Sequence, residues 1–263
     1  MSSKLIDSHC HFDFEVFEGQ RHQVISQLLK KGVAALIIPG VQPTQWGSLS
    51  TLINTYPKQL FGAVGLHPWW VESLNQAHSI IVENLRSDLL LGLQHNNVIA
   101  IGECGLDGDI DCSMALQQLV FEVHLELACN ESVPLIVHAH KAHNEVLRLL
   151  KKYKPSAGGV IHGFSGSYEL AQQYFQLGFK LGVGGSITYE RARKTRAAIK
   201  AMPLDALLLE TDAPDMPLSG KQGEINSPLY LPLIAQSLAE LKSISYTEVC
   251  DATYNNTKTL FRL

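Results

Sequence analysis

The sequence lacks an apolar run long enough to cross a membrane. No uninterrupted hydrophobic stretch approaches the ~18–20 residues that a transmembrane helix needs, although hydrophobic residues form 46% of the 263-residue chain. The first residues include Lys4 but no extended apolar segment, so we expect no signal peptide. These absences predict a cytoplasmic protein that makes no membrane contact.

Charged residues are also few, and neither sign dominates. They form 17% of the chain, and the formal net charge is −4. Because a general positive field is absent, any contact with nucleic acid must come from a local site.

Cysteine motifs and linkers are missing as well. The five cysteines contain no CxxC pair and are odd in number, which is typical of a protein kept in a reducing compartment. No low-complexity segment or shift in composition divides the chain. We therefore predict a single domain over residues 1–263, with enough hydrophobic residues for a large core.

What the sequence does contain is a series of eight short apolar segments. They span residues 4–11, 34–41, 60–68, 97–107, 133–140, 158–165, 179–186 and 206–214. Such runs are typical of strands buried on both faces, and segments with helical spacing, such as 21–32, 114–131 and 167–178, lie between them. Repeated strand–helix alternation predicts an α/β fold of the TIM type, a closed parallel (β/α)8 barrel. An open doubly wound sheet is the alternative, and the count of eight favours the barrel.

Polar residues gather at the ends of these predicted strands, where a barrel builds its active site. They are His9, His11, His67, Glu103, His138, His140, His162 and Asp212. A lone histidine is usually an ordinary structural residue, but six at one barrel mouth beside two carboxylates indicate a metal site.

The first strand carries Asp7, His9 and His11 at every second position, so strand alternation places them on one face. Two imidazoles at this spacing can bind one ion. Asp7 is then expected to accept a hydrogen bond from a liganding histidine and fix its tautomer, the alternative being a salt bridge or cap at the barrel floor. Glu210 lies one layer deeper than Asp212 and is expected to be a buried structural acid.

Glu103, on the fourth strand, is a candidate bridge between two ions, because a carboxylate has two oxygens. With His138 and His162 beyond the His9/His11 pair, a site for two divalent ions is feasible, and two such ions can clamp the oxygens of a phosphoester displacement. Asp212 is the expected final ligand and a candidate acceptor for a proton of the attacking water.

Six motifs resemble the TatD family of metal-dependent hydrolases and deoxyribonucleases. They are DSHCHFD, GLHP, GECGLD, VPLIVHAH, HGFSG and ETDAPDMP, and the last resembles the YjjV-like branch most. The resemblance covers nearly the whole chain and implies an amidohydrolase-like barrel. It implies one metal held by His9, His11, Glu103 and Asp212, a second held by Glu103, His138 and His162, and His67 near the scissile phosphate. It also implies a nucleic-acid substrate, the 3′ end of single-stranded DNA.

Two positions depart from the family pattern. His140 stands where relatives usually have an arginine that would give a bidentate fork for phosphate. A histidine there offers a pH-dependent donor or a further ligand. Gly108 and Asp109 stand where relatives often have bulky residues, and Asp109 and Asp111 would repel a polyanion.

Our leading hypothesis is a metal-dependent phosphodiesterase of the deoxyribonuclease type, acting on a DNA end or a small phosphoester. One rival is amide or lactone hydrolysis on the same site, although many such barrels bridge their metals with a modified lysine where this chain has Glu103. The other rival is a metal-stabilised binding protein without turnover. The donor set accepts Zn, Mn, Ni, Fe or Mg, and the sequence fixes neither the metal nor the oligomeric state.

Two further features carry open alternatives. Trp69 and Trp70 follow GLHP and could stack a base or pack their loop. The basic segment 189–200 could meet a phosphate backbone, but a solvated helix face is favoured.

Overall fold

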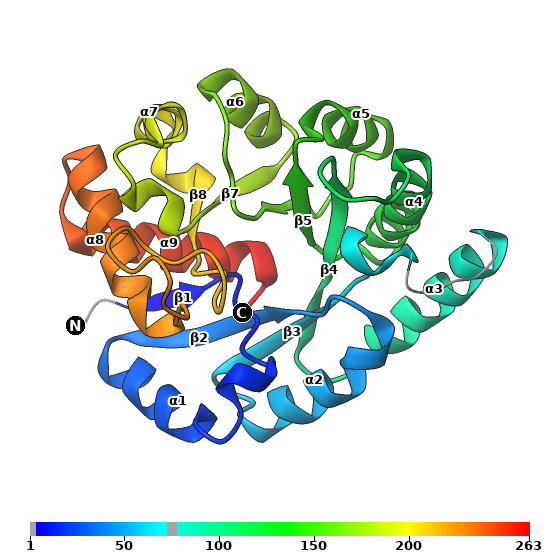
Figure 1. Cartoon of the computed structure of the whole chain (residues 1–263), viewed down its shortest axis with the longest axis horizontal. Helices are drawn as coiled ribbons and strands as arrows, with labels where there is room; N and C mark the ends of the chain where they lie inside the picture. The colour runs from blue at the N-terminus through cyan, green and yellow to red at the C-terminus, as the bar shows by residue number, and fades with distance from the viewer. Residues whose placement is uncertain (1–3, 73–77) are drawn as a thin grey trace.

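Eight parallel strands form one sheet in the order β1 to β8, each paired with its successor in the chain (Figure 1). The structure is a computed structural model that describes residues 4–72 and 78–263. The strands are β1 (Leu5–Asp7), β2 (Val33–Pro39), β3 (Leu60–Val64), β4 (Val98–Asp107), β5 (Leu135–His140), β6 (Gly159–Ile161), β7 (Phe179–Val183) and β8 (Leu207–Leu209). The amide of Ser8 donates to the carbonyl of Leu209 over 2.9 Å and joins the last strand to the first. The predicted TIM-type barrel is thus confirmed.

The helices surround the strands (Figure 1). They are α1 (Arg21–Lys30), α2 (Pro43–Thr55), α3 (His78–Gly92), α4 (Met114–Glu131), α5 (His143–Tyr153), α6 (Tyr168–Gln176), α7 (Arg193–Ala201), α8 (Leu231–Lys242) and α9 (Tyr246–Phe261). None of the helices within the described residues combines the length and apolarity that a bilayer span requires.

Two clusters of buried residues build the core. The larger one lies between the strands and the helices and includes Leu5 and Leu209. The smaller one consists mainly of strand residues such as Ile6, Ile136 and Leu208, and it also includes Phe261 of α9. Because neighbouring residues of a strand face opposite sides, the second set fills the barrel interior below the functional groups.

The floor of the barrel contains a glycine that no other residue can replace without strain. Gly158 has a φ of +65°, and an added Cβ would lie 2.2 Å from the carbonyl oxygen of Gly178. That oxygen belongs to the backbone, so a side chain at 158 would force the chain entering β6 away from the chain entering β7.

We expect Gly158→Ala to lower the free energy of unfolding by roughly 3 kcal/mol, through left-handed strain and the steric overlap together. Gly19→Ala is the matched control, because Gly19 has a φ of +76° and no atom within 4 Å of an added Cβ. It should cost only about 1–2 kcal/mol. Urea denaturation measures both, and equal losses would contradict the role assigned to the Gly178 contact.

Candidate metal centre

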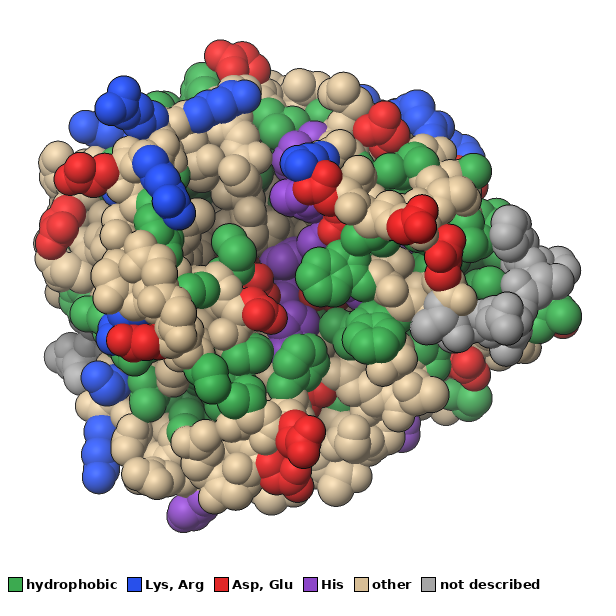
Figure 2. Space-filling model, in the orientation of Figure 1, with side chains coloured by type: hydrophobic (Ala, Val, Ile, Leu, Met, Phe, Trp, Pro, Cys, Tyr) green, Lys and Arg blue, Asp and Glu red, His purple; other side chains and the backbone are tan. Residues whose placement is uncertain are grey.

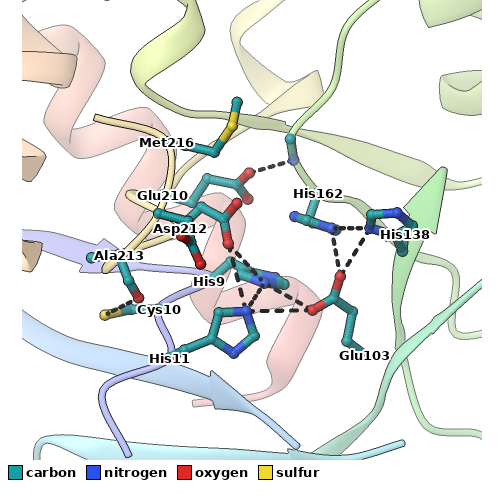
Figure 3. A network of polar contacts seen from close by, with 12 residues as sticks. His9, Cys10, His11, Glu103, His138, His162, Glu210, Asp212, Ala213 and Met216 are labelled. Carbon is teal, nitrogen blue, oxygen red and sulfur yellow. Dashed lines mark hydrogen bonds and ion pairs between the residues drawn. The ribbon is translucent and has the colours of Figure 1, made fainter. Parts of the chain in front are cut away.

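The carboxyl ends of the strands bring histidines and carboxylates together at one mouth of the barrel (Figure 3). Glu103 and His138 lie on β4 and β5, whereas the others lie just beyond strand ends: His9 and His11 after β1, His67 after β3, His162 after β6 and Asp212 after β8. All are buried or nearly so. The cluster is therefore nearly closed to solvent, and the side chains of Asp212 and His138 keep small exposed fractions of 17% and 15%.

Glu103 stands at the centre of the cluster, with one oxygen toward each of two sets of histidines. Its Oε2 lies 3.2 Å from Nε2 of His9 and 3.6 Å from Nε2 of His11. Asp212 completes this first set, since its Oδ1 lies 3.4 Å and 3.6 Å from the same two nitrogens.

The other oxygen of Glu103 faces the second set. Its Oε1 lies 2.7 Å from Nε2 of His162, 3.1 Å from Nδ1 of His138 and 3.3 Å from Nε2 of His67. The ring of His162 also stacks on that of His9 with centroids 4.0 Å apart, so the two sets are in contact.

The backbone of β4 places Glu103 at this central point. The pairing of β4 with β5 shifts register between Ile101 and Cys104. Gly102 lies within the irregularity and Gly105 follows it, with φ of +148° and +141°, and a Cβ on Gly105 would lie 2.0 Å from the carbonyl oxygen of His138. Only glycine allows this close approach, which aims Glu103 into the mouth.

His9 and His11 do not lie on the first strand as predicted. Strand β1 ends at Asp7 and the chain bends at Ser8, so these histidines lie in the following segment. Their Nε2 atoms are nevertheless 3.3 Å apart. The expected shared face with Asp7 is wrong, because the bend at Ser8 interrupts the alternation.

Asp7 and Glu210 are both completely buried but contact different groups. Asp7 accepts hydrogen bonds from the Thr211 hydroxyl (2.6 Å) and from the amides of Thr211 (3.0 Å) and His9 (3.2 Å). The predicted bond from a histidine ring to Asp7 is therefore not found. Glu210 accepts hydrogen bonds from the amide of Gly163 and the hydroxyl of Ser8. Both acids hold the backbone segments that carry the cluster.

The geometry of the first set fits a bound cation. Two ligand atoms bonded to one Zn²⁺ at ~2.0–2.1 Å in tetrahedral geometry lie roughly 3.3 Å apart. Nε2 of His9 and Nε2 of His11 lie 3.3 Å from each other and 3.2–3.6 Å from one oxygen of Glu103 and one oxygen of Asp212. Three overlapping groups of possible ligands occur among the described residues: His9/His11/Glu103, His9/His162/Asp212 and His67/Glu103/His138. The donors thus suit one ion or two.

Charge states at the centre also suit metal binding, which requires neutral imidazoles. Burial lowers the pKa of His9, His11 and His67, that of His11 to about 4. Burial opposes the ionisation of Glu103, but the surrounding histidines outweigh it and hold the pKa of this carboxyl well below its usual range. His138 and His162 are exceptions. Burial opposes their protonation, but contacts with Asp107 and Glu103 raise the pKa of His138, and the attraction of Glu103 raises that of His162 to about 10.

Asp107 is a further component of the site that sequence reasoning missed. Its Oδ2 lies 3.1 Å from Nε2 of His138 and accepts the indole N–H of Trp69 over 2.8 Å. Burial opposes its ionisation, yet the hydrogen bonds from His138, the Asp109 amide and Trp69 lower its pKa. A carboxylate only accepts, so Nε2 of His138 carries the proton and Nδ1 is left to face Glu103. Asp107 lies four residues after Glu103 on β4, a spacing that could have revealed it.

The two residues predicted to bind substrate differ in position. His67 lies within the cluster and belongs to one of the groups of possible ligands. His140 lies at the outer edge, where its Nε2 is 3.1 Å from Oδ2 of Asp109, a carboxylate that Lys141 also contacts. None of the ligand groups in the described part of the chain includes His140.

A buried histidine of α4 positions the loop that carries His67. His124 is fully buried, and its Nε2 accepts the amide of Leu66 over 3.0 Å. Its Nδ1 lies 2.8 Å from the carbonyl oxygen of Val120 and must donate to it. Burial lowers the pKa of His124 to about 4, so the ring is neutral at pH 7.

His124 should make folding sensitive to acid. The unfolded chain binds a proton near the ordinary pKa of 6.5 but the folded chain only near 4, so stability is lost as the pH falls between these values. The loss should total roughly 3 kcal/mol. His124→Gln should flatten this part of the pH dependence in urea denaturation with a chelator present, and an unchanged slope would contradict the assignment.

Asp107→Asn should weaken the binding of one metal ion about 10–100-fold, because the amide no longer fixes the His138 tautomer. Competition with a chromophoric Zn²⁺ chelator measures this. Asp109→Asn is the matched control, since Asp109 is exposed at the rim, and it should leave the affinity within about twofold. Equal affinities for Asp107→Asn and the native protein would show that Asp107 does not support the site.

The chain is similar to several known proteins. Residues 6–262 match the family model described as TatD related DNase. The chain is 40% identical to an uncharacterized metal-dependent hydrolase of Escherichia coli, YjjV, over the full length of both proteins. The crystal structure of that TatD homologue superposes with a TM-score of 0.92, 39% identity and complete coverage of both chains. A 3′-5′ ssDNA/RNA exonuclease TatD of Edwardsiella piscicida is 32% identical, covering 94% of this chain and 95% of its own. The protein is therefore a member of the TatD family of metal-dependent hydrolases.

Proposed function

We propose that the protein hydrolyses phosphodiester bonds with two divalent ions, the preferred substrate being a single-stranded DNA end. The observation that carries the proposal is the division of Glu103 between two donor sets, with Oε2 toward His9 and His11 and Oε1 toward His138 and His162. A bridging carboxylate with histidines on each side is the arrangement expected of a two-metal hydrolase.

The donor sets divide between the two ions in this proposal. His9, His11, Glu103 and Asp212 hold one ion, and Glu103, His138 and His162 hold the other, with Zn, Mn, Mg or Ni all compatible with the donors. When bound, such ions make water a nucleophile at neutral pH and offset charge on phosphate oxygens.

The residues of the chain supply orientation and proton transfer. Asp212 has the partly exposed carboxylate of the first set, so it can accept a proton from an attacking water that enters from solvent. Asp107 holds His138 in one tautomer. His67 lies at the mouth with Nε2 3.3 Å from Glu103, and in this proposal its ring interacts with a phosphate oxygen when substrate binds.

The nucleic-acid part of the proposal rests on relatives. The matching family is described as TatD related DNase, and the Edwardsiella relative is named a 3′-5′ ssDNA/RNA exonuclease. Glu103 supplies the bridge with its own carboxylate, which favours phosphodiester chemistry over the amide or lactone alternative.

Asp212→Asn should reduce kcat on single-stranded DNA about 10²–10⁴-fold, the usual effect of removing a general base. The assay follows 5′-labelled DNA and bis-p-nitrophenyl phosphate after the protein has been stripped with EDTA and reloaded with Zn²⁺, Mn²⁺, Ni²⁺ or Mg²⁺. Asp215→Asn, an exposed acid of the same loop, should stay within about threefold of the native rate.

A panel of lactones and amides tests which kind of bond the protein hydrolyses. Turnover confined to lactones would replace phosphodiester hydrolysis with the rival chemistry. A folded, metal-loaded protein with no turnover of any substrate would assign it a binding role instead.

A further inference from the structure

Trp69 is largely exposed at the mouth, yet buried groups of the metal centre fix its position. Its side chain is 65% exposed. The indole N–H donates to Asp107, and the backbone amide donates to Nδ1 of His67 over 3.1 Å. The indole also meets the His67 ring edge-on at 5.4 Å between centroids. An aromatic face that is both fixed and open to solvent is a preformed binding surface, because little conformational freedom is lost when a ligand packs on it.

The surroundings of Trp69 favour a planar apolar group over a long polyanion. Figure 2 shows hydrophobic side chains on either side of the histidines and acidic groups at the centre of this face, while most Lys and Arg lie toward the edge. Phe14 stacks on the His11 ring at 4.8 Å, and Met216 is 48% exposed in the loop after Asp212. Lys141, a cation of the rim, contacts Asp109.

Two arginines of the basic segment after β7 have partners close to them in the chain. The guanidinium of Arg191 lies over the Tyr189 ring at 4.8 Å. Arg196 donates to the carbonyl oxygen of Ile187. Both side chains are therefore held by local contacts.

We propose that Trp69 is the stacking platform for the base of the nucleotide whose phosphate is cleaved. This inference rests on the proposed function, and it adds the way in which the substrate is recognised. His67 contacts both the indole and Glu103, so the platform is one side chain away from the place where the phosphate would bind. Recognition then depends on one terminal base and its phosphate, which agrees with a rim where Lys141 contacts Asp109 and where His140 stands in place of an arginine.

Stacking of one base on an aromatic side chain changes affinity by roughly five- to a hundred-fold. The test compares thymidine 5′-monophosphate with 2-deoxyribose 5-phosphate, which has the same phosphate and sugar without the base. Both ligands are titrated into the Mg²⁺-loaded protein by calorimetry. We expect the nucleotide to bind about tenfold more tightly or better.

Three variants separate stacking from support of the metal site. Trp69→Leu should bring the affinities of the two ligands to within about twofold of each other. Trp69→Phe keeps a ring but loses the N–H bond to Asp107, so it should keep most of the preference for the nucleotide. Trp70→Leu is the matched control, because successive residues of the 3-10 helix Pro68–Trp70 point about 120° apart, and it should keep the native preference.

Fluorescence gives a second readout that does not require Trp69→Leu to fold. Trp46 is only 6% exposed, so in Trp70→Leu the exposed tryptophan is Trp69. The nucleotide should quench its emission and 2-deoxyribose 5-phosphate should not.

Equal binding of the two ligands to the native protein would overturn the inference. A preference for the nucleotide that survives in Trp69→Leu would also overturn it. If Trp69→Leu weakened the binding of both ligands equally, Trp69 would act only through Asp107, and the inference would again be wrong. Base-dependent binding without phosphodiester hydrolysis would refute the proposed reaction and leave the platform standing. Hydrolysis without base-dependent binding would refute the stacking platform and leave the proposed reaction standing.

Discussion

The structure of this site depends on one buried carboxylate surrounded by imidazoles. Glu103 is 2% exposed and lies within 3.6 Å of nitrogens from five histidines on four different segments. A carboxylate removed from water must be compensated by positive charge or hydrogen bonds. Three features bring the histidines to the two oxygens of Glu103. They are the glycines of β4, the bend after β1 and the contact of Asp107 with His138.

The fold was predictable because its signal is repeated. Eight apolar segments separated by helical spacing leave few architectures open, and the structure has the eight strands in chain order. The polar residues at the strand ends were identified for the same reason, and the structure brings His9, His11, Glu103, His138, His162 and Asp212 together. The predicted strand alternation does not extend past Asp7, however. The periodicity of the sequence does not show where strand pairing ends.

The orientation of the side chains at the mouth depends on contacts between distant segments, which no local pattern encodes. Asp107 and Trp69 are 38 positions apart and share one hydrogen bond. His140 and His138 lie on one strand, but the carboxylate of Asp109 is near His140 and that of Asp107 near His138. The place of His67 among the possible ligands depends on His124 of α4, which lies on a helix and not at a strand end. These contacts orient the side chains. The sequence predicts that the side chains meet at the mouth but not how they are oriented.

Anomalous diffraction from crystals of the Mn²⁺- or Zn²⁺-loaded protein tests the central claim most directly. The account predicts two peaks on opposite sides of the Glu103 carboxylate, each about 2.0–2.3 Å from an oxygen of that group. One peak should contact His9 and His11, and the other His138 and His162. A peak that has no contact with Glu103, or metal bound elsewhere on the chain, would contradict it.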